Sequence, residues 1–320
     1  MNTIKIINSE LVHQFLPMPV CIDALMSAMK AVSQNKVTNP PRVFTSVNDG
    51  GGKLGLMPGA AEDIPVYGTK ILSLQPGNEK RELPSIQGAI LLFDQDSGTP
   101  VAMLDGISIT AIRTAAASGL ATKLLARQNA GSHGIIGTGV QAKYHAEAIL
   151  CARPSISRTV IWGRDKNKAK GLAKELSARF ADQFLAAETL EDAARCDVVS
   201  TVTASATPLL EGRWLQAGAH INLVGSHEPD KREADTKAIT GSAVYVDHFQ
   251  GAMSEAGDLL IPISEGQFSE SDIVGEIGAL ALGQIAGRSD ENANTLYKSL
   301  GLFAQDLYAA WAVLKAAGEA

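Results

Sequence analysis

Residues 134–142 read Gly-Ile-Ile-Gly-Thr-Gly-Val-Gln-Ala, and this stretch decides the fold class of the chain. An apolar run leads into the pattern Gly-x-Gly-x-x-Ala, which is followed by a segment of helical character. Gly137 permits a tight turn after a strand, Gly139 allows backbone N–H groups to approach a pyrophosphate, and Ala142 keeps the next helix close to the sheet. A second strand is expected at residues 159–162, at the spacing of a βαβ unit. The stretch therefore predicts a dinucleotide-binding turn, with an ordinary glycine-rich turn as the alternative.

The composition of the 320 residues is typical of a globular α/β enzyme. Hydrophobic residues make up 45% of the chain and charged residues 19%, so a large core can be buried. The net charge of −6 argues against a general nucleic-acid binder, and an anionic substrate would need local cations. No apolar run reaches membrane-spanning length, and the three scattered cysteines indicate free thiols and no metal site. We therefore expect a cytoplasmic protein with neither nucleic-acid nor membrane partners.

The residues before the glycine-rich stretch are expected to mix helices and strands. Ser9 is predicted to cap an early helix, which Pro17 and Pro19 interrupt. A long helix with an apolar stripe is predicted from about residue 108 to about residue 127. The predicted strands are 66–73, 89–94 and 100–105, and a hairpin turn joins the last two.

The second half alternates strands and helices, which predicts a Rossmann-type, doubly wound parallel sheet. The tail from residue 299 to residue 316 is helical, and its small apolar residues suggest that it packs back on the first domain. The fold class is therefore α/β, with a Rossmann domain at 116–299 and a discontinuous α+β domain at 1–115 and 300–320. The expected strands of the parallel sheet lie near 133–137, 159–162, 197–202, 220–224 and 243–246.

The end of the second predicted strand bears on the choice of nicotinamide cofactor. Sites that prefer NAD carry an acidic residue there, which binds the ribose hydroxyls, but this chain has Gly163. Arg164 and Lys168 follow and suit a 2′-phosphate, so the sequence predicts NADP(H). The alternative is NAD(H), with Asp165 binding the ribose and the two cations belonging to a solvated helix start.

Further candidate residues for cofactor binding follow the ends of neighbouring strands. Because the carboxyl ends of parallel strands meet at one edge of the sheet, these residues are expected to line the crevice where such sheets bind ligands. The candidates are Gly137, Thr138, Gly139, Val140, Gln141, Thr201, Val202, Thr203, Val224, Gly225 and Ser226.

Several segments together resemble the ornithine cyclodeaminase/μ-crystallin family. They occur in the family's order and cover nearly the whole chain. The resemblance implies a Rossmann domain beside a substrate-binding and dimerisation domain, a homodimer, and a cofactor contact from Thr114. The segments are Pro41-Arg42, 55–58 (Gly-Leu-Met-Pro), Thr69-Lys70, 109–116 (Ile-Thr-Ala-Ile-Arg-Thr-Ala-Ala), the turn at Gly137, 161–164 (Ile-Trp-Gly-Arg), 201–203 (Thr-Val-Thr), 229–235 (Pro-Asp-x-Arg-Glu-x-Asp) and 298–301 (Lys-Ser-Leu-Gly).

The family handles α-amino or α-imino acids by hydride transfer at the α-carbon, which requires a clamp for the substrate carboxylate. Arg42, Lys70 and Arg113 match the clamp positions, and Met57 matches a further substrate contact. Taken singly, Arg42 also fits a surface residue and Lys70 an edge strand. Arg113 lies on an alanine-rich helix beside an apolar stripe, where an unpaired charge is costly, so we expect a partner or a ligand for it.

The resemblance also separates two reactions. Cyclodeaminases of the family carry acidic residues at the positions of Gly55 and His227, and both acids are absent here. Glu228 lies one position away. We therefore predict NADPH-dependent reduction of a cyclic imino acid, either Δ1-pyrroline-2-carboxylate to proline or Δ1-piperideine-2-carboxylate to pipecolate. Lys70, Arg113 and His227 are the predicted catalytic residues, with His227 as a proton donor or, alternatively, a solvent-facing loop histidine.

Other functions within the family remain open. The chain could be an ornithine cyclodeaminase, an amino-acid dehydrogenase, or a μ-crystallin-like protein that binds NADPH with little turnover. His145 is expected to be structural, and His248 is a weaker candidate near the ligand edge. Asp306 matches an acidic position that is common in the family, and its role stays open.

Overall fold

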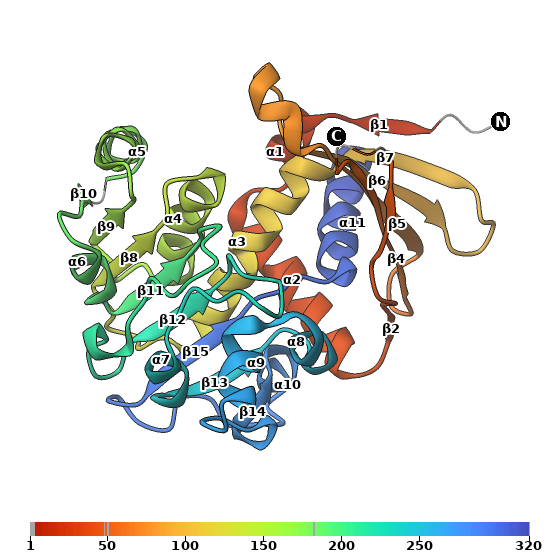
Figure 1. Cartoon of the computed structure of the whole chain (residues 1–320). Coiled ribbons are helices and arrows are strands. Elements are labelled where there is room, and N and C mark those ends of the chain that lie inside the picture. Colours follow the sequence, from red (N-terminus) through yellow and green to blue (C-terminus); the bar gives the residue numbers. More distant parts are fainter. Residues whose placement is uncertain (1–3, 48, 50, 182, 320) are drawn as a thin grey trace. The chain divides into compact units, whose positions relative to one another are not determined.

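The computed structural model describes residues 4–47, 49, 51–181 and 183–319 of the chain (Figure 1). The chain divides into two compact units, unit 1 (Met1–Arg113 with Gly301–Ala320) and unit 2 (Thr114–Leu300). The boundaries predicted from the sequence lie after residues 115 and 299. One helix, α3 (Gly106–Leu125), continues through the first boundary.

Unit 1 contains a seven-stranded sheet in the order β1-β7-β6-β5-β4-β2, with β3 paired to β4. β1 runs parallel to β7, and the other neighbours are antiparallel. The three strands predicted from the sequence are confirmed as β5, β6 and β7. The strands are β1 (Lys5–Ile7), β2 (Val37–Thr38), β3 (Val43–Ser46), β4 (Lys53–Ala61), β5 (Val66–Leu74), β6 (Ile86–Asp94) and β7 (Pro100–Asp105).

β4 is not among the predicted strands, because two glycines and Pro58 interrupt its pattern. The structure accommodates the proline because β3 pairs with β4 only as far as Leu56, whereas β2 pairs with it only from Ala60 onward. Pro58 therefore lies in a gap between two neighbours, where its missing N–H is not required.

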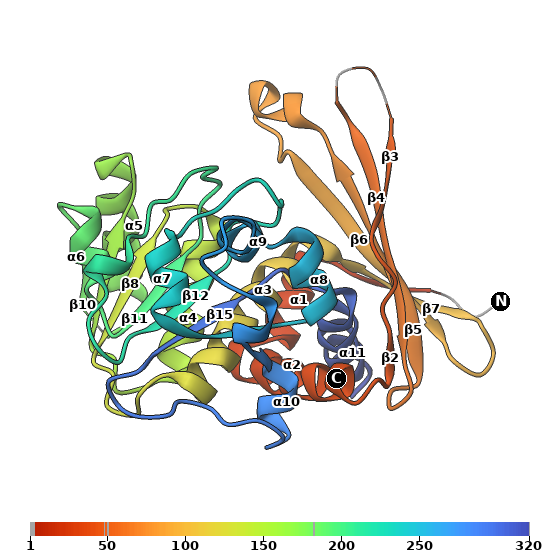
Figure 2. The same cartoon turned by 60° about the horizontal axis from the view of Figure 1, so that its bottom comes forward.

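Helices lie on one face of this sheet, where α11 packs against β4 and β5 and α2 packs against α11 (Figure 2). They are α1 (Ser9–Phe15), α2 (Met18–Ser33) and α11 (Phe303–Glu319), and a short 3-10 helix spans Pro76–Arg81. The prediction that Ser9 caps α1 is wrong, because Asn8 is the cap and accepts a hydrogen bond from the backbone N–H of Leu11. The predicted interruption is confirmed, since Pro17 precedes the first turn of α2.

Unit 2 is a sheet of eight parallel strands in the order β10-β9-β8-β11-β12-β15-β13-β14. From β8 the chain proceeds outward to β10, returns to β11 and continues in the other direction. The predicted doubly wound sheet is confirmed, and its switch point lies between β8 and β11. The strands are β8 (Ser132–Ile136), β9 (Arg158–Trp162), β10 (Gln183–Ala186), β11 (Val198–Thr201), β12 (His220–Leu223), β13 (Ser242–Val246), β14 (Ile273–Glu276) and β15 (Asn294–Lys298).

Helices pack on both faces of the parallel sheet. Ile135 and Ile161 face the core shared with α4 and α5, whereas Ile136 and Val160 face the core shared with α6, α7 and α8. The alternation along each strand buries both faces, as expected of a doubly wound sheet. The helices are α4 (Val140–Ala152), α5 (Lys166–Arg179), α6 (Leu190–Ala194), α7 (Thr236–Thr240), α8 (Phe249–Glu255), α9 (Gly257–Ser264) and α10 (Ile277–Ala281), with 3-10 helices at Gly212–Trp214 and Glu270–Asp272.

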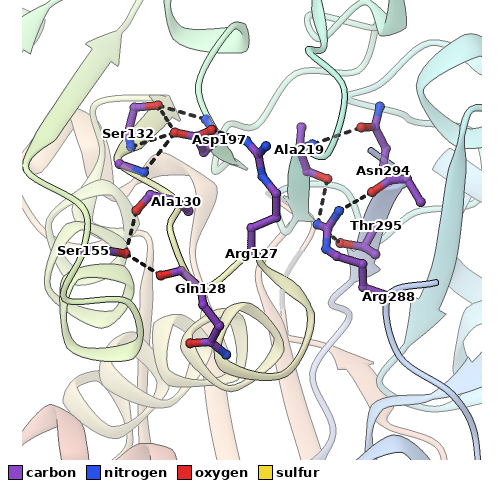
Figure 3. Close-up of polar contacts among 12 residues, drawn as sticks. Arg127, Gln128, Ala130, Ser132, Ser155, Asp197, Ala219, Arg288, Asn294 and Thr295 are labelled. Atoms are coloured by element: carbon purple, nitrogen blue, oxygen red, sulfur yellow. Dashed lines mark hydrogen bonds and ion pairs between the residues drawn. The ribbon is translucent and has the colours of Figure 1, made fainter. Parts of the chain in front are cut away.

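A polar network holds the amino ends of these strands (Figure 3). Asp197 accepts hydrogen bonds from the backbone N–H and the hydroxyl of Ser132, at 3.0 and 2.7 Å, and pairs with Arg127. Arg288 donates to the carbonyl of Leu125 at 2.9 Å, and Arg153 donates to that of Ala126 at 3.1 Å. The two arginines therefore satisfy carbonyls at the carboxyl end of α3, where the helix dipole also favours cations.

Cys21, Cys151 and Cys196 form no disulfide bond within the part of the chain that the structure describes. Over the described residues, no single helix is long and apolar enough to cross a membrane, although the bent pair α1 and α2 passes on length and composition alone.

Candidate active site

A buried ionic cluster occupies the covered face of the unit 1 sheet. Lys70 lies in the middle of β5, and its ammonium contacts one carboxylate oxygen of Asp306 at 2.6 Å. The Nε atom of Arg113, from α3, donates to the other oxygen of Asp306 at 3.0 Å. The Nη1 atom of Arg113 donates to the side-chain carbonyl of Gln305 at 2.9 Å. Lys70, Arg113 and Asp306 are 1%, 6% and 0% exposed, so the whole cluster is shielded from water.

The charges of this cluster do not balance. Lys70 and Arg113 carry two positive charges, and Asp306 is the only described carboxylate that pairs with them. Arg42 adds a third cation, since its charge acts on Lys70 and its Nη2 atom donates to the carbonyl of Gly301 at 3.3 Å. An excess buried positive charge is costly unless an anion compensates it. The cluster is therefore suited to binding an anionic group.

Burial and neighbouring charges shift the pKa values of the cluster. Burial, assisted by the charges of Arg113 and Arg42, lowers the pKa of Lys70 to about 8, although Asp306 opposes the shift. Burial would raise the pKa of Asp306, but Arg113 and Lys70 outweigh it and hold that pKa below its usual value. Asp306 is therefore ionised at neutral pH, whereas Lys70 can gain or lose a proton near it.

Gly301 makes room for the guanidinium group. Its φ of +79° lies in the left-handed region, and a Cβ there would come within 2.6 Å of Nη1 of Arg113. Both the backbone conformation and the contact thus require glycine at this position, just before α11.

The neighbouring part of the same sheet face is apolar. Met57 is the cross-strand neighbour of Lys70 and is buried. Further along, Gly55 lies beneath the ring of Phe44, because a Cβ on Gly55 would come within 2.6 Å of that ring. The position that carries an acid in cyclodeaminases is therefore covered by an aromatic side chain in this protein.

The glycine-rich turn lies at the switch point of the unit 2 sheet, after β8. Gly137 has a φ of +129°, and a Cβ there would come within 2.8 Å of the carbonyl oxygen of Val202, in the loop after β11. Gly139 caps the amino end of α4, and no atom lies within 4 Å of the Cβ position there. An open space at a helix amino end beside the switch point fits the pyrophosphate of a dinucleotide. Thr138, Val140 and Gln141 belong to the same turn.

The loop after β9 carries the residues predicted to select the cofactor. A Cβ on Gly163 would meet the methyl group of Thr138 at 2.5 Å. Asp165 caps α5, where one of its oxygens accepts bonds from the backbone N–H groups of Asn167 and Lys168. The side chains of Arg164 and Lys168 are exposed, and neither forms an ion pair with another residue in the described ranges.

The other predicted residues fall into one unit or the other. Arg42, Lys70 and Arg113 are brought together in unit 1, whereas Thr114 begins unit 2. His227 is exposed in the loop after β12, and His248 caps α8 by accepting from Gly251 at 3.3 Å. His145 is buried and hydrogen-bonded to Ser118, which fits a structural role.

Two residues of the sites carried little signal in the sequence. Gln305 and Glu233 are both buried and engaged in hydrogen bonds, yet each looks in sequence like a surface residue. Glu233 lies in the family motif at 229–235, and its position four residues after Pro229 is the sequence feature that could have indicated its importance. The sequence assigns no role to Asp306. In the structure it is the counter-ion of Lys70 and Arg113.

Together these features define a Rossmann-fold protein with a dinucleotide-type turn in one unit and a buried ionic cluster in the other. The chain belongs to the ornithine cyclodeaminase/mu-crystallin family, whose model matches residues 4–320.

Similar proteins agree with this assignment. A Δ(1)-pyrroline-2-carboxylate reductase of Bacillus cereus is 36% identical over 285 residues, which cover 88% of this chain and 87% of that protein. The structure of Thermococcus litoralis Δ(1)-pyrroline-2-carboxylate reductase, in complex with NADH and L-proline, matches with a TM-score of 0.93 at 33% identity and covers 99% of this chain and 98% of that one. A dimeric archaeal alanine dehydrogenase with bound NAD matches with a TM-score of 0.91 at 29% identity, over 99% of this chain and 96% of that one.

Proposed function

We propose that the protein reduces the C=N bond of a cyclic imino acid with a hydride from NAD(P)H, and that Δ1-pyrroline-2-carboxylate, which yields proline, is its main substrate. The excess positive charge of the Lys70, Arg113 and Asp306 cluster carries the proposal, because it calls for one carboxylate. The similarity to two proteins named as reductases of this imino acid supports the same conclusion.

Different residues of the chain orient the substrate and hold a proton near the reacting carbon. The guanidinium groups of Arg113 and Arg42 hold the substrate carboxylate, and so orient the C=N bond. Lys70, with a pKa of about 8, holds a proton at Nζ close to this anion. Asp306 keeps that proton on Lys70 by pairing with the ammonium. The nicotinamide cofactor supplies the hydride when it is bound, and the turn at Gly137 and Gly139 would hold its pyrophosphate.

Reduction fits the chain better than cyclodeamination. Cyclodeamination must hold and deprotonate a distal ammonium, which requires carboxylates. Phe44 covers Gly55, and His227 replaces the second acid. An apolar wall suits the CH₂ groups of a ring and does not suit a second charged amine.

A panel of substrates tests the proposed function. NADPH oxidation, followed by absorbance, should be rapid with Δ1-pyrroline-2-carboxylate and measurable with the six-membered Δ1-piperideine-2-carboxylate. Ornithine with the oxidised cofactor should release no ammonia, and pyruvate with ammonium should consume no NADPH. Tight cofactor binding without turnover of either imine would instead favour a binding protein, and ammonia release from ornithine would favour a cyclodeaminase.

We further propose that the protein prefers NADP(H) to NAD(H). The exposed Arg164 and Lys168 support this preference, as does the use of Asp165 as a helix cap. Arg164→Ala should raise the KM for NADPH by about tenfold, because one charge-assisted contact to a phosphate is lost. The KM for NADH should change by less than about twofold, because NADH lacks the 2′-phosphate. Lys166→Ala is the matched control, because Lys166 pairs with Glu188 on the same surface. Equal effects on both cofactors would contradict the preference.

We also propose that the protein forms a homodimer through the open face of the unit 1 sheet. On this face Ile6, Leu56 and Met103 are 68%, 39% and 41% exposed, although they lie within strands. Large apolar side chains left exposed within the strands of one sheet face are typical of a surface covered by a partner. Light scattering, which reports the mass in solution, tests the proposal, and a monomer at micromolar concentration would contradict it.

A further inference from the structure

The carboxylate of Glu233 lies between two loops of unit 2 and binds both. One oxygen accepts hydrogen bonds from the backbone N–H and the hydroxyl of Thr203, at 2.8 and 2.6 Å. The other oxygen accepts from the backbone N–H of Gly225 at 2.6 Å and from the hydroxyl of Thr201 at 2.8 Å. Glu233 is 0% exposed, so no water competes for these four bonds.

This arrangement favours a carboxylate over a neutral amide. A backbone N–H can only donate, and each oxygen of Glu233 faces one, from Thr203 or from Gly225. A neutral amide in this place must turn its NH₂ group toward one of the two N–H groups, whichever way it is oriented. Burial raises the pKa of Glu233, while the bonds from Thr203 and the charge of Lys298 oppose the shift.

A second buried carboxylate holds the surrounding backbone. Asp258 accepts bonds from the backbone N–H groups of Glu233 and Ala234, at 2.8 and 3.1 Å. Its other oxygen pairs with Lys298 at 2.8 Å, and Lys298 also donates to the carbonyl of Ser226 at 2.5 Å. Ser226 belongs to the same loop as Gly225. Asp258 and Lys298 therefore fix the backbone of Glu233, while its side chain binds the two loops.

The two loops follow β11 and β12, the first two strands beyond the switch point. A Rossmann sheet consists of two mononucleotide-binding halves, and β8 with its glycine turn begins the first half, whereas β11 begins the second. The loops are also in close contact, since a Cβ on Gly225 would come within 2.0 Å of the carbonyl oxygen of Thr203.

We propose that Glu233 is a positioning residue, which holds the loops after β11 and β12 in the shape that binds the nicotinamide half of the cofactor. The inference rests on the proposed function in assuming a nicotinamide dinucleotide, and its test with 2′,5′-ADP also uses the proposed preference for NADP(H). The adenosine half, whose 2′-phosphate would contact Arg164 and Lys168 after β9, should not depend on Glu233.

Binding of the whole dinucleotide and of its adenosine part tests this inference. Glu233→Gln should weaken NADPH binding, measured by fluorescence, by at least about tenfold, because one loop loses its acceptor. Binding of 2′,5′-ADP, measured by calorimetry, should change by less than about twofold. Thr201→Val removes one of the four bonds without changing the shape of the side chain. Thr201→Val should weaken NADPH binding by a smaller factor, and it provides the test if Glu233→Gln does not fold.

Controls separate this inference from a general loss of structure. Glu175→Gln, on the exposed surface of α5, should leave both affinities unchanged. The inference is overturned if Glu233→Gln binds NADPH like the wild type, or if NADPH and 2′,5′-ADP weaken equally. Failure of the wild-type protein to reduce any imine would contradict the proposed function and would leave this binding result unaffected.

Discussion

Arg113→Ala should lower kcat/KM for the imino acid by about 1000-fold, or about 4 kcal/mol, if the clamp orients the reacting carbon. The guanidinium is 6% exposed and lies beside Asp306, so water cannot replace it. The loss should appear in kcat as well as in KM, because a carboxylate that is held loosely leaves the C=N bond misoriented.

The same substitution should leave the protein folded. Lys70 and Asp306 remain as a balanced pair, and the excess positive charge of the cluster falls to that of Arg42. Thermal unfolding of Arg113→Ala should therefore occur near the wild-type temperature or above it. Asp306→Asn makes the opposite change, because it leaves two buried cations without a counter-ion, and it should lower both stability and activity.

Arg113→Lys is the matched control for geometry. It keeps the charge but loses the forked donor, so its activity should lie between those of the wild type and the alanine variant. Wild-type kcat/KM in Arg113→Ala would show that the cluster does not bind the substrate.

The free energy of unfolding should fall steeply as the pH drops below about 6.5, because three histidines are buried in the neutral form. Burial lowers the pKa of His133 from 6.5 to about 3, and His145 adds to this shift. Burial also lowers the pKa of His145 to about 4 and, assisted by Arg288, that of His220 to about 3.

The sign follows from proton binding. Below pH 6.5 the unfolded chain takes up protons on these histidines and the folded protein does not, so unfolding is favoured as the pH falls. At about pH 5.5 each histidine accounts for a loss of about 1.4 kcal/mol, or about 4 kcal/mol together, which is a large part of a typical total stability. The stability is fully present above about pH 7.5 and is lost progressively down to the folded pKa values of 3 to 4.

Hydrogen bonding supports the neutral state. One ring nitrogen of His133 contacts Ser200 at 3.0 Å, and the other has no acceptor among the described residues. A second ring proton on His133 would therefore be buried without a partner. In His220 one ring nitrogen lies 2.9 Å from the hydroxyl of Thr295.

Denaturant unfolding between pH 8 and pH 5 measures this dependence. His133→Asn should reduce the slope of stability against pH by about one third. An unchanged slope in this variant would contradict the assignment of the protons to the buried histidines.

The parts of the fold that could be predicted are those with a local signal. The turn at residues 134–142 combines a strand, two glycines and a helix within a few residues, and it proved to lie at the switch point. β5, β6 and β7 show the alternation and turn residues of antiparallel strands. In contrast, β15 enters the sheet between β12 and β13, which no local pattern can indicate, because the order of strands depends on tertiary packing.

The candidate site was predictable only as far as family motifs reach. The resemblance identifies Lys70 and Arg113 as site residues. Their ion pairs with Asp306 join residues that are 236 and 193 positions apart, which no local pattern reveals. Glu233 carries no hydrophobic pattern, and its function as an acceptor depends on two backbone N–H groups that only the folded loops bring to it.

Because unit 1 is built from both ends of the chain, the order of synthesis affects how it matures. Lys70 and Arg113 emerge from the ribosome before Thr114–Leu300, and Asp306 emerges after it. The parallel sheet can therefore fold during translation before α11 is available to the first sheet. A nascent chain cut short before α11 would keep a complete nucleotide fold and would expose two cations with no counter-ion, a species that quality-control proteases should remove.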